Sequence, residues 1–273
     1  MDVVDKKTDT GMSNSAGMGK AVWAALAGIL LLSCILILLQ RTMEPQMGRD
    51  SCYYLVLVDL WHTGGFQSVV DFLGEFWFPP LHLFLLVLLA RAGLSPESAA
   101  LVIGMGCGML MPLVSFAIAR ELFHDKRLAL AAALLTAVNP SIIGMAVQAQ
   151  RDVPYLFCAG WCIFLLIAAV RRRQWFWWCG AGGVFGVSML IRYETAEFLP
   201  LLGIYLIAVL WKKQQKWYSV IRDLSLFAAS ALISMILLLW CSGTLDYMSR
   251  AYYRYFEGQT GALFRLYKKG ERK

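Results

Sequence analysis

Two aspartates border long apolar segments and are the first candidates for chemistry in this sequence. Asp50 follows the first apolar run, and Asp152 immediately precedes another. Ionisable groups beside membrane-sized segments are rare unless they are paired, hydrated or functional, so both carboxylates are candidate catalytic residues. A carboxylate next to a hydroxyl group can take its proton and make the oxygen a better nucleophile. Aspartates also cap the first turn of helices, and that structural role remains an alternative for both.

Six further residues are candidate ligand contacts: Tyr53, Tyr54, His82, Arg151, Arg192 and Glu194. The arginines carry the positive charge that binds a phosphate, and Glu194 could orient an acceptor. The same residues allow simpler interpretations. Arg151 could pair with the neighbouring Asp152, and Arg192 with Glu194 could simply mark a turn between two spans.

Histidine chemistry is limited, because the chain has only three histidines. A single histidine in an apolar helix, such as His82, is more often a snorkelling polar residue than a metal ligand. We therefore assign no metal ligand and no certain cofactor. A divalent cation held between Asp50 and Asp152 remains an alternative, since hard cations take oxygen ligands.

The composition is that of an integral membrane protein. Hydrophobic residues make up 59% of the 273 residues, charged residues make up 16%, and the mean hydropathy is +0.60. Backbone that crosses hydrocarbon must satisfy its own hydrogen bonds, so we expect an all-α, polytopic bundle. The net charge of +7 follows basic loops between apolar runs, which argues against a nucleic-acid partner. The seven cysteines show no C-x-x-C spacing and are read as small apolar fillers.

The apolar runs predict about seven transmembrane helices and one interfacial helix. A span needs about 20 residues, and the runs assigned as spans are 21–39, 99–119, 128–147, 153–170, 175–191, 198–211 and 224–241. Another run, 79–90, would cover only about 18 Å of a hydrocarbon layer of roughly 30 Å. We expect it to lie at the interface, where Pro79-Pro80 suits the first turn of a helix.

Charges give the expected orientation. Basic loops are retained on the cytoplasmic side, and the three strongly basic loops here are 120–127, 171–173 and 212–216. All three lie inside if the N-terminal tail is inside and 79–90 does not cross. Residues 40–98 then form one large extracytoplasmic loop. Asp50, Asp152, Arg192 and Glu194 would converge on the external face of the cell (inner) membrane.

The chain divides into a disordered cytoplasmic tail (1–20), a transmembrane domain (21–241) that includes the loop 40–98, and a C-terminal segment (242–273) that lies on the membrane surface or is truncated. Within the loop, an amphipathic helix is expected to start at Asp50 and to end near Gly64-Gly65. Its apolar face gathers Tyr54, Leu57, Val58 and Trp61. A Gly-x-x-x-Gly pair at Gly182 and Gly186 predicts close helix packing.

The order of motifs over residues 21–211 resembles the membrane-embedded glycosyltransferases of the GT-C type. It is most similar to the branch that contains the dolichyl-phosphate-mannose protein mannosyltransferases and the aminoarabinose transferases. The matching motifs are Asp50-x-x-Tyr53-Tyr54 with Trp61 and Gly64-Gly65, then Pro79-Pro80-Leu81, Gly93-Leu94-Ser95, Arg120-Glu121-Leu122-Phe123, Asn139-Pro140 and Arg151-Asp152-Val153-Pro154.

The resemblance implies a hexosyl or pentosyl transferase that takes a sugar from a polyprenyl-phosphate lipid. The acceptor would be a protein, a glycan or a lipid on the outer side of the membrane. The resemblance also implies that Asp50 is the general base and that Asp152 helps to form the site. Arg151 or Arg192 could then stabilise the leaving phosphate.

Two positions depart from this pattern. Ser51 stands where many members of this group have a second acidic residue, and Phe78 stands where many have lysine. The alternative to an enzyme is a transporter or assembly subunit, or a degenerate or truncated relative that has lost activity. A transporter would be expected to place polar residues near span midpoints and to contain inverted repeats, and neither is visible in the sequence.

Overall fold

The computed structural model describes residues 19–43, 49–73, 79–200, 203–204 and 217–247. These residues form helices and no strand, which confirms the predicted all-α class. The elements are α1 (Lys20–Met43), α2 (Arg49–Leu73), α3 (Pro80–Arg91), α4 (Pro96–Phe123), α5 (Lys126–Ala137), α6 (Pro140–Ala146), α7 (Asp152–Arg172), α8 (Trp175–Ile191), the 3-10 helix η1 (Tyr193–Glu197) and α10 (Trp217–Cys241).

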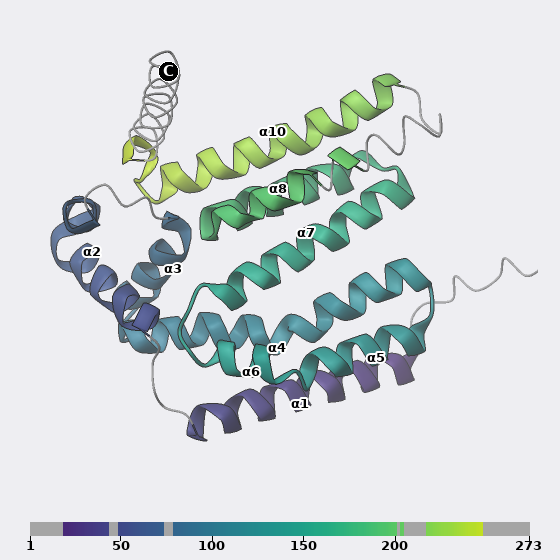
Figure 1. The fold of residues 1–273 in the computed structure, drawn as a ribbon, viewed down its shortest axis with the longest axis horizontal. Helices are drawn as coiled ribbons and strands as arrows, with labels where there is room; N and C mark the ends of the chain where they lie inside the picture. Colours follow the sequence, from purple (N-terminus) through teal and green to yellow (C-terminus); the bar gives the residue numbers. More distant parts are fainter. Residues whose placement is uncertain (1–18, 44–48, 74–78, 201–202, 205–216, 248–273) are drawn as a thin grey trace, which may run out of the picture.

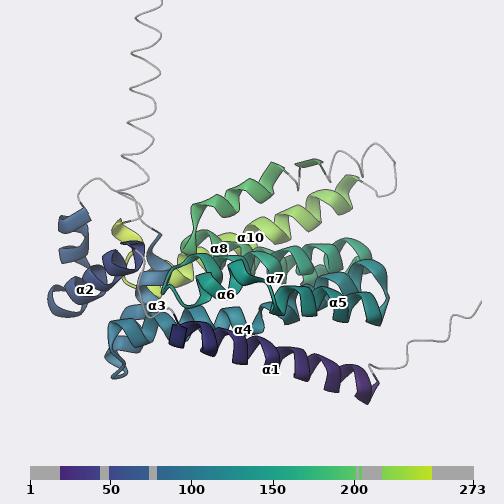
Figure 2. The same ribbon diagram turned by 60° about the horizontal axis from the view of Figure 1, so that its bottom comes forward.

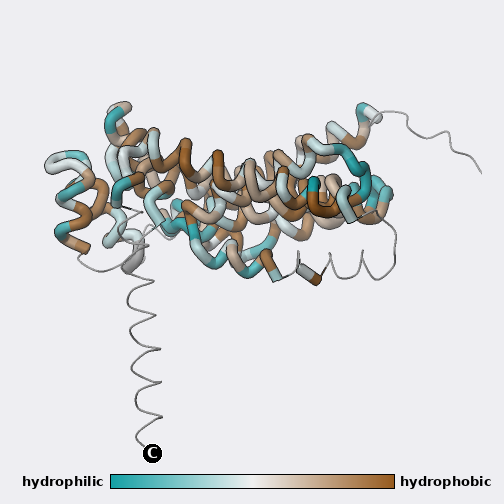
Figure 3. Tube along the Cα trace, turned by 90° about the horizontal axis from the view of Figure 1, so that it is seen from above, coloured by the Kyte–Doolittle hydropathy of each residue, from teal (hydrophilic) through white to brown (hydrophobic). Residues whose placement is uncertain are grey.

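The long helices lie side by side in one bundle, with α2 and α3 at one end (Figures 1 and 2). Helix α4 packs against α1 and α5, α7 lies between α4 and α8, and α8 packs most extensively on α10. Hydrophobic residues dominate the middle of the bundle, and hydrophilic residues gather mainly towards its ends (Figure 3). This distribution is that of a bundle whose long axis crosses a membrane.

Glycines explain the close packing of α8 on α10. A Cβ atom at Gly182 would collide with the carbonyl group of Phe227, and one at Gly186 would meet Ala231. The small-residue packing predicted from the sequence is therefore present.

Four helices are long and apolar enough to cross a membrane, namely α1, α4, α7 and α10. Helices α5 and α6 form a fifth candidate, a pair bent by 53°. Helix α8 is apolar but has only 17 residues. Most of the expected span 198–211 lies outside the described residues, so the count of seven stays a prediction.

The bend between α5 and α6 was not expected, because 128–147 was predicted as one continuous span. Asn139 is the cap of α6, and its side-chain oxygen accepts hydrogen bonds from the backbone N–H groups of Ser141 at 2.9 Å and Ile142 at 3.4 Å. Pro140 has no N–H to continue the hydrogen-bond ladder of α5. The Asn-Pro pair therefore ends one helix and starts another.

Helix α3 lies at one end of the bundle beside α2 and the start of α4, rather than alongside the long helices (Figure 1). Its buried Leu83, Leu86 and Val87 pack in one cluster with the apolar face of α2, whose members are the predicted Tyr54, Leu57, Val58 and Trp61. The interfacial position of this helix stays a prediction.

The first helical segment of α2 ends near Gly64-Gly65, as expected, because Gly65 leaves the helical conformation. Gly65 adopts φ 76° and ψ 178°, and the helix resumes after this kink and continues to Leu73. Positive φ is accessible to glycine without a steric penalty, so Gly65 can form the break between the two helical segments of α2.

Other predicted segments fall largely outside the described residues. These are the tail 1–20, of which only Gly19 and Lys20 are described, and the C-terminal segment 242–273, which is described up to Tyr247.

Candidate active site

A cluster of charged side chains lies where α7 begins and α8 ends. Arg192 forms one ion pair with Asp152 and a second with Glu194, whose Oε1 is 2.8 Å from the arginine Nε. Asp152 is the first residue of α7, Arg192 is the extended residue that ends α8, and Glu194 follows in η1. Because α7 and α8 are antiparallel neighbours, the start of one meets the end of the other.

Tyr155 completes the surroundings of Arg192. The guanidinium carbon lies 5.5 Å from the centroid of the Tyr155 ring, within the range of a cation–π contact. Sequence analysis did not select Tyr155. The spacing that could have identified it is three residues after Asp152, which places both side chains on one face of α7.

Arg192 is held in place, and much of its charge is already compensated. Burial, the largest single effect, raises the pKa of Glu194, but the hydrogen bond from Arg192, a backbone hydrogen bond and the charges of Arg192 and Arg151 together leave that pKa below its usual range. Two carboxylates therefore face one guanidinium. Any phosphate at this point would bind through the remaining N–H donors of Arg192.

Arg151 contributes a second positive charge to this end of the bundle. It precedes Asp152 at the cap position of α7, and its charge acts on both His82 and Glu194. Asp152 forms an ion pair with Arg192.

The first turn of α2 is anchored close to this cluster. Ser51 is fully buried, and its hydroxyl group donates a hydrogen bond to the carbonyl oxygen of Gln148, in the connection between α6 and α7. A carboxylate in place of Ser51 would face that carbonyl oxygen without a proton to donate. The contact therefore gives a physical reason why a hydroxyl group suits this position.

Asp50 is the second residue of α2, directly before Ser51. Its side chain lies outside the part of the chain that the structure describes. The catalytic role of this carboxylate stays a prediction.

His82 is buried, with 1% of its surface exposed, and does not snorkel. Its ring meets the Tyr54 ring edge to face, with the centroids 5.1 Å apart, and neither ring nitrogen has a hydrogen-bond partner among the described residues. Burial, together with a smaller effect of the Arg151 charge, lowers the pKa of His82 to about 3. The imidazole is neutral at physiological pH, so it cannot supply the positive charge of the missing lysine.

The two tyrosines predicted as ligand contacts face different surroundings. Tyr54 is buried against His82, whereas Tyr53 is 38% exposed, and its ring centroid lies 6.1 Å from that of Phe72. Tyr53 is therefore the more accessible of the two to a ligand.

The described side chains do not test the alternative of a metal ion. Among them, no group of three or more His, Cys, Asp and Glu residues is placed to hold a metal ion. The alternative of a cation between Asp50 and Asp152 depends on a carboxylate outside this set.

Comparison with known proteins gives one family. The model described as dolichyl-phosphate-mannose-protein mannosyltransferase matches residues 78–240. The match begins after Asp50 and the two tyrosines, and it includes His82, Arg151, Asp152, Arg192 and Glu194. No curated protein matches the chain. The matched region is more than half of the chain, and the chain therefore belongs to the dolichyl-phosphate-mannose-protein mannosyltransferase family of GT-C type membrane glycosyltransferases.

Proposed function

We propose that this protein transfers a sugar from a polyprenyl-phosphate donor to a hydroxyl group on the extracytoplasmic side of the cell membrane. Membership of the family is the observation on which the reaction class rests. The position of the charged cluster supports the extracytoplasmic location. Asp152, Arg192 and Glu194 lie at the end of the bundle opposite the basic loops 120–127 and 171–173. Basic loops are retained in the cytoplasm, so the opposite end faces outward.

The proposed reaction is a single displacement. Asp50 takes the proton of the acceptor hydroxyl group, and the oxygen forms a bond to the anomeric carbon of the sugar. The bond from that carbon to the phosphate oxygen breaks, and polyprenyl phosphate leaves with the electron pair. One base suffices, no covalent enzyme intermediate forms, and the configuration at the sugar inverts.

The charged cluster would act on the phosphate of the donor. Arg151 and the unused donors of Arg192 would stabilise the charge that develops on the leaving group. Asp152 and Glu194 would act as positioning residues, because their ion pairs hold Arg192. His82 is neutral and could donate one hydrogen bond, while Tyr53 offers an exposed ring to the sugar or the acceptor.

The first step of the test is to identify the glycosylated product. Mass spectrometry of glycans, lipids and proteins from cells with and without the gene would identify the acceptor that loses a sugar. Purified protein in liposomes, supplied with the corresponding polyprenyl-phosphate sugar, would then transfer that sugar to the acceptor.

Asp50→Asn should lower this transfer rate by about 10²- to 10⁴-fold, the range typical of a lost general base. The matched control is Asp59→Asn, which neutralises an exposed carboxylate on the same helix and should leave the rate unchanged. Wild-type activity in Asp50→Asn would reject the base assignment. If the wild-type protein itself moved no sugar, the proposed function would fail.

A further inference from the structure

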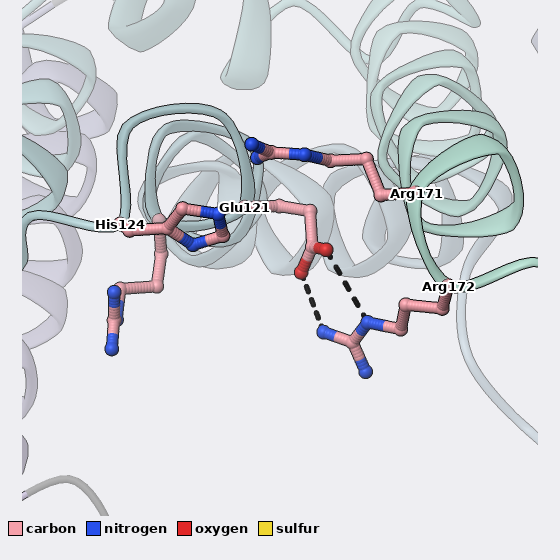
Figure 4. Close-up of a pocket in the computed structure, with 5 residues that line it drawn as sticks. Glu121, His124, Arg171 and Arg172 are labelled. Atoms are coloured by element: carbon pink, nitrogen blue, oxygen red, sulfur yellow. Dashed lines mark hydrogen bonds and ion pairs between the residues drawn. The ribbon is translucent and has the colours of Figure 1, made fainter. Parts of the chain in front are cut away.

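An open pocket of about 480 Å³ lies at the end of the bundle opposite the candidate active site, formed by α4 and α7. Its lining residues are Arg120, Glu121, His124, Arg171 and Arg172 (Figure 4). Two arginines come from the last turn of α7, and Arg120 with Glu121 comes from the last turns of α4. The family assignment gives this pocket no role.

Positive charge exceeds negative charge in the pocket. Glu121 accepts hydrogen bonds from Arg172 Nε at 3.3 Å and Nη2 at 2.5 Å, so these two charges compensate each other (Figure 4). Arg171 donates from Nη1 to the carbonyl oxygen of Leu122 at 3.1 Å, a contact that orients the guanidinium but does not neutralise it. The side chain of Arg120 has no hydrogen bond or ion pair within the described part of the chain.

Simpler explanations account for only part of this arrangement. Arginines near the C-terminal ends of helices complement the helix dipole, and cytoplasmic loops are generally basic. Neither explanation requires a cavity at this position. Neither requires that two arginines on its wall, Arg120 and Arg171, form no ion pair with a carboxylate of the described residues. An open pocket with surplus guanidinium groups has the features of an anion site.

Neighbouring side chains set the depth of the pocket relative to the membrane. Helices α4 and α7 are both candidate spans and end at the pocket. Beside it, Phe123 is 61% exposed and Trp175 is 62% exposed, and the Arg172 guanidinium lies 4.6 Å from the centroid of the Trp177 ring. Exposed aromatic residues next to the end of a span mark the level of lipid headgroups.

We propose that this pocket binds the phosphate of an anionic phospholipid headgroup, with Arg120 and Arg171 as its charged contacts. The exposed side chains of Leu122 and Phe123 would lie against the acyl chains of the same lipid. The proposal concerns the far end of the bundle from the transfer site and does not depend on the proposed reaction.

The experiment uses the full chain purified from neutral detergent into nanodiscs of phosphatidylcholine, alone or mixed with phosphatidylglycerol. Native mass spectrometry would count the lipids that stay bound after the nanodisc is released. Arg120→Gln with Arg171→Gln should weaken the retention of phosphatidylglycerol about tenfold relative to wild type, as expected for lost charge-assisted contacts. Arg120→Gln alone should give a smaller loss in the same direction. Because the Arg120 side chain has no hydrogen bond or ion pair with another described residue, removing its charge breaks no such contact among those residues.

The matched control is Arg127→Gln with Arg173→Gln, which removes the same charge from exposed positions at the same end of the bundle but outside the pocket. It should retain phosphatidylglycerol as the wild type does, and an equal loss would show that only bulk charge matters. A last experiment adds inorganic phosphate to the protein in detergent and measures its melting temperature and its bound lipids. If the phosphate raised the melting temperature of the wild type and displaced no bound lipid, the site would bind a free anion and the lipid assignment would be overturned.

Discussion

Both ends of the bundle contain ion pairs between arginine and carboxylate side chains, but the ratio of arginines to carboxylates differs between the two clusters. At the end with α2 and α3, one arginine, Arg192, is shared by two carboxylates and lies beside a tyrosine ring. At the other end, one carboxylate, Glu121, lies among three arginines. The difference indicates that an arginine–carboxylate pair between helices is not itself a functional signal. The two sites differ in the net charge that remains after the ion pairs are counted. A small net charge leaves the paired groups fixed in position, whereas excess positive charge attracts an anion.

Neutralising one carboxylate at each end gives the largest expected contrast. Asp152→Asn removes one of the two ion pairs of Arg192, and a misplaced catalytic cation can cost about 100-fold in rate. Glu121→Gln should leave the transfer rate within about twofold, because its partner Arg172 lies far from the reacting atoms. Initial rates with the polyprenyl-phosphate donor would measure both. Equal losses in the two variants would break the distinction between the ends.

Arg192→Lys tests whether geometry or charge matters at the site. Lysine keeps the positive charge but cannot bind two carboxylates in the fixed planar geometry of a guanidinium. We expect transfer to fall about tenfold, mostly in kcat, because the cation would be less well placed in the transition state. Steady-state kinetics over a range of donor concentrations would separate kcat from KM. An unchanged kcat would mean that charge alone is sufficient.

His82 gives the smallest predicted effect, a dependence of stability on pH. Its pKa of about 3 in the folded protein lies below the ordinary value of 6.5, so between these values the unfolded chain binds more protons. The contribution of neutral His82 to stability is therefore complete above pH 6.5 and declines as the pH falls towards 3. Melting temperatures at pH 7 and pH 5 should differ by a few degrees more in wild type than in His82→Phe. Parallel pH profiles would show that His82 is not buried in its neutral form.

Local sequence pattern was sufficient for the approximate positions of most described helices and for the buried face of α2. The pattern also predicted that Asp152, Arg192 and Glu194 lie at one end, because the order of apolar runs and basic loops along the chain indicates which connections share a side. It did not identify Arg192 as the partner of Asp152. Arg151 is the nearer residue in sequence, but the antiparallel packing of α7 and α8 decides which side chains meet across helices.

Other features depended on tertiary packing in the same way. His82 was expected to reach towards solvent, yet α2 covers it with Tyr54. The break at Asn139-Pro140 was not predicted, because the apolar character on both sides favoured one span. Hydrophobicity reports which segments avoid water and does not report where a continuous helix ends.

The contact between Ser51 and the Gln148 carbonyl has a consequence for protein engineering. It joins the first turn of α2 to the connection before α7, so these two stretches of chain form one structural unit although they are far apart in sequence. A chimaera that receives an α2 segment with an acidic residue after the aspartate would place a carboxylate against that carbonyl group. Exchange between relatives should therefore transfer residues 49–73 and 148–152 together, because neither segment is an independent module.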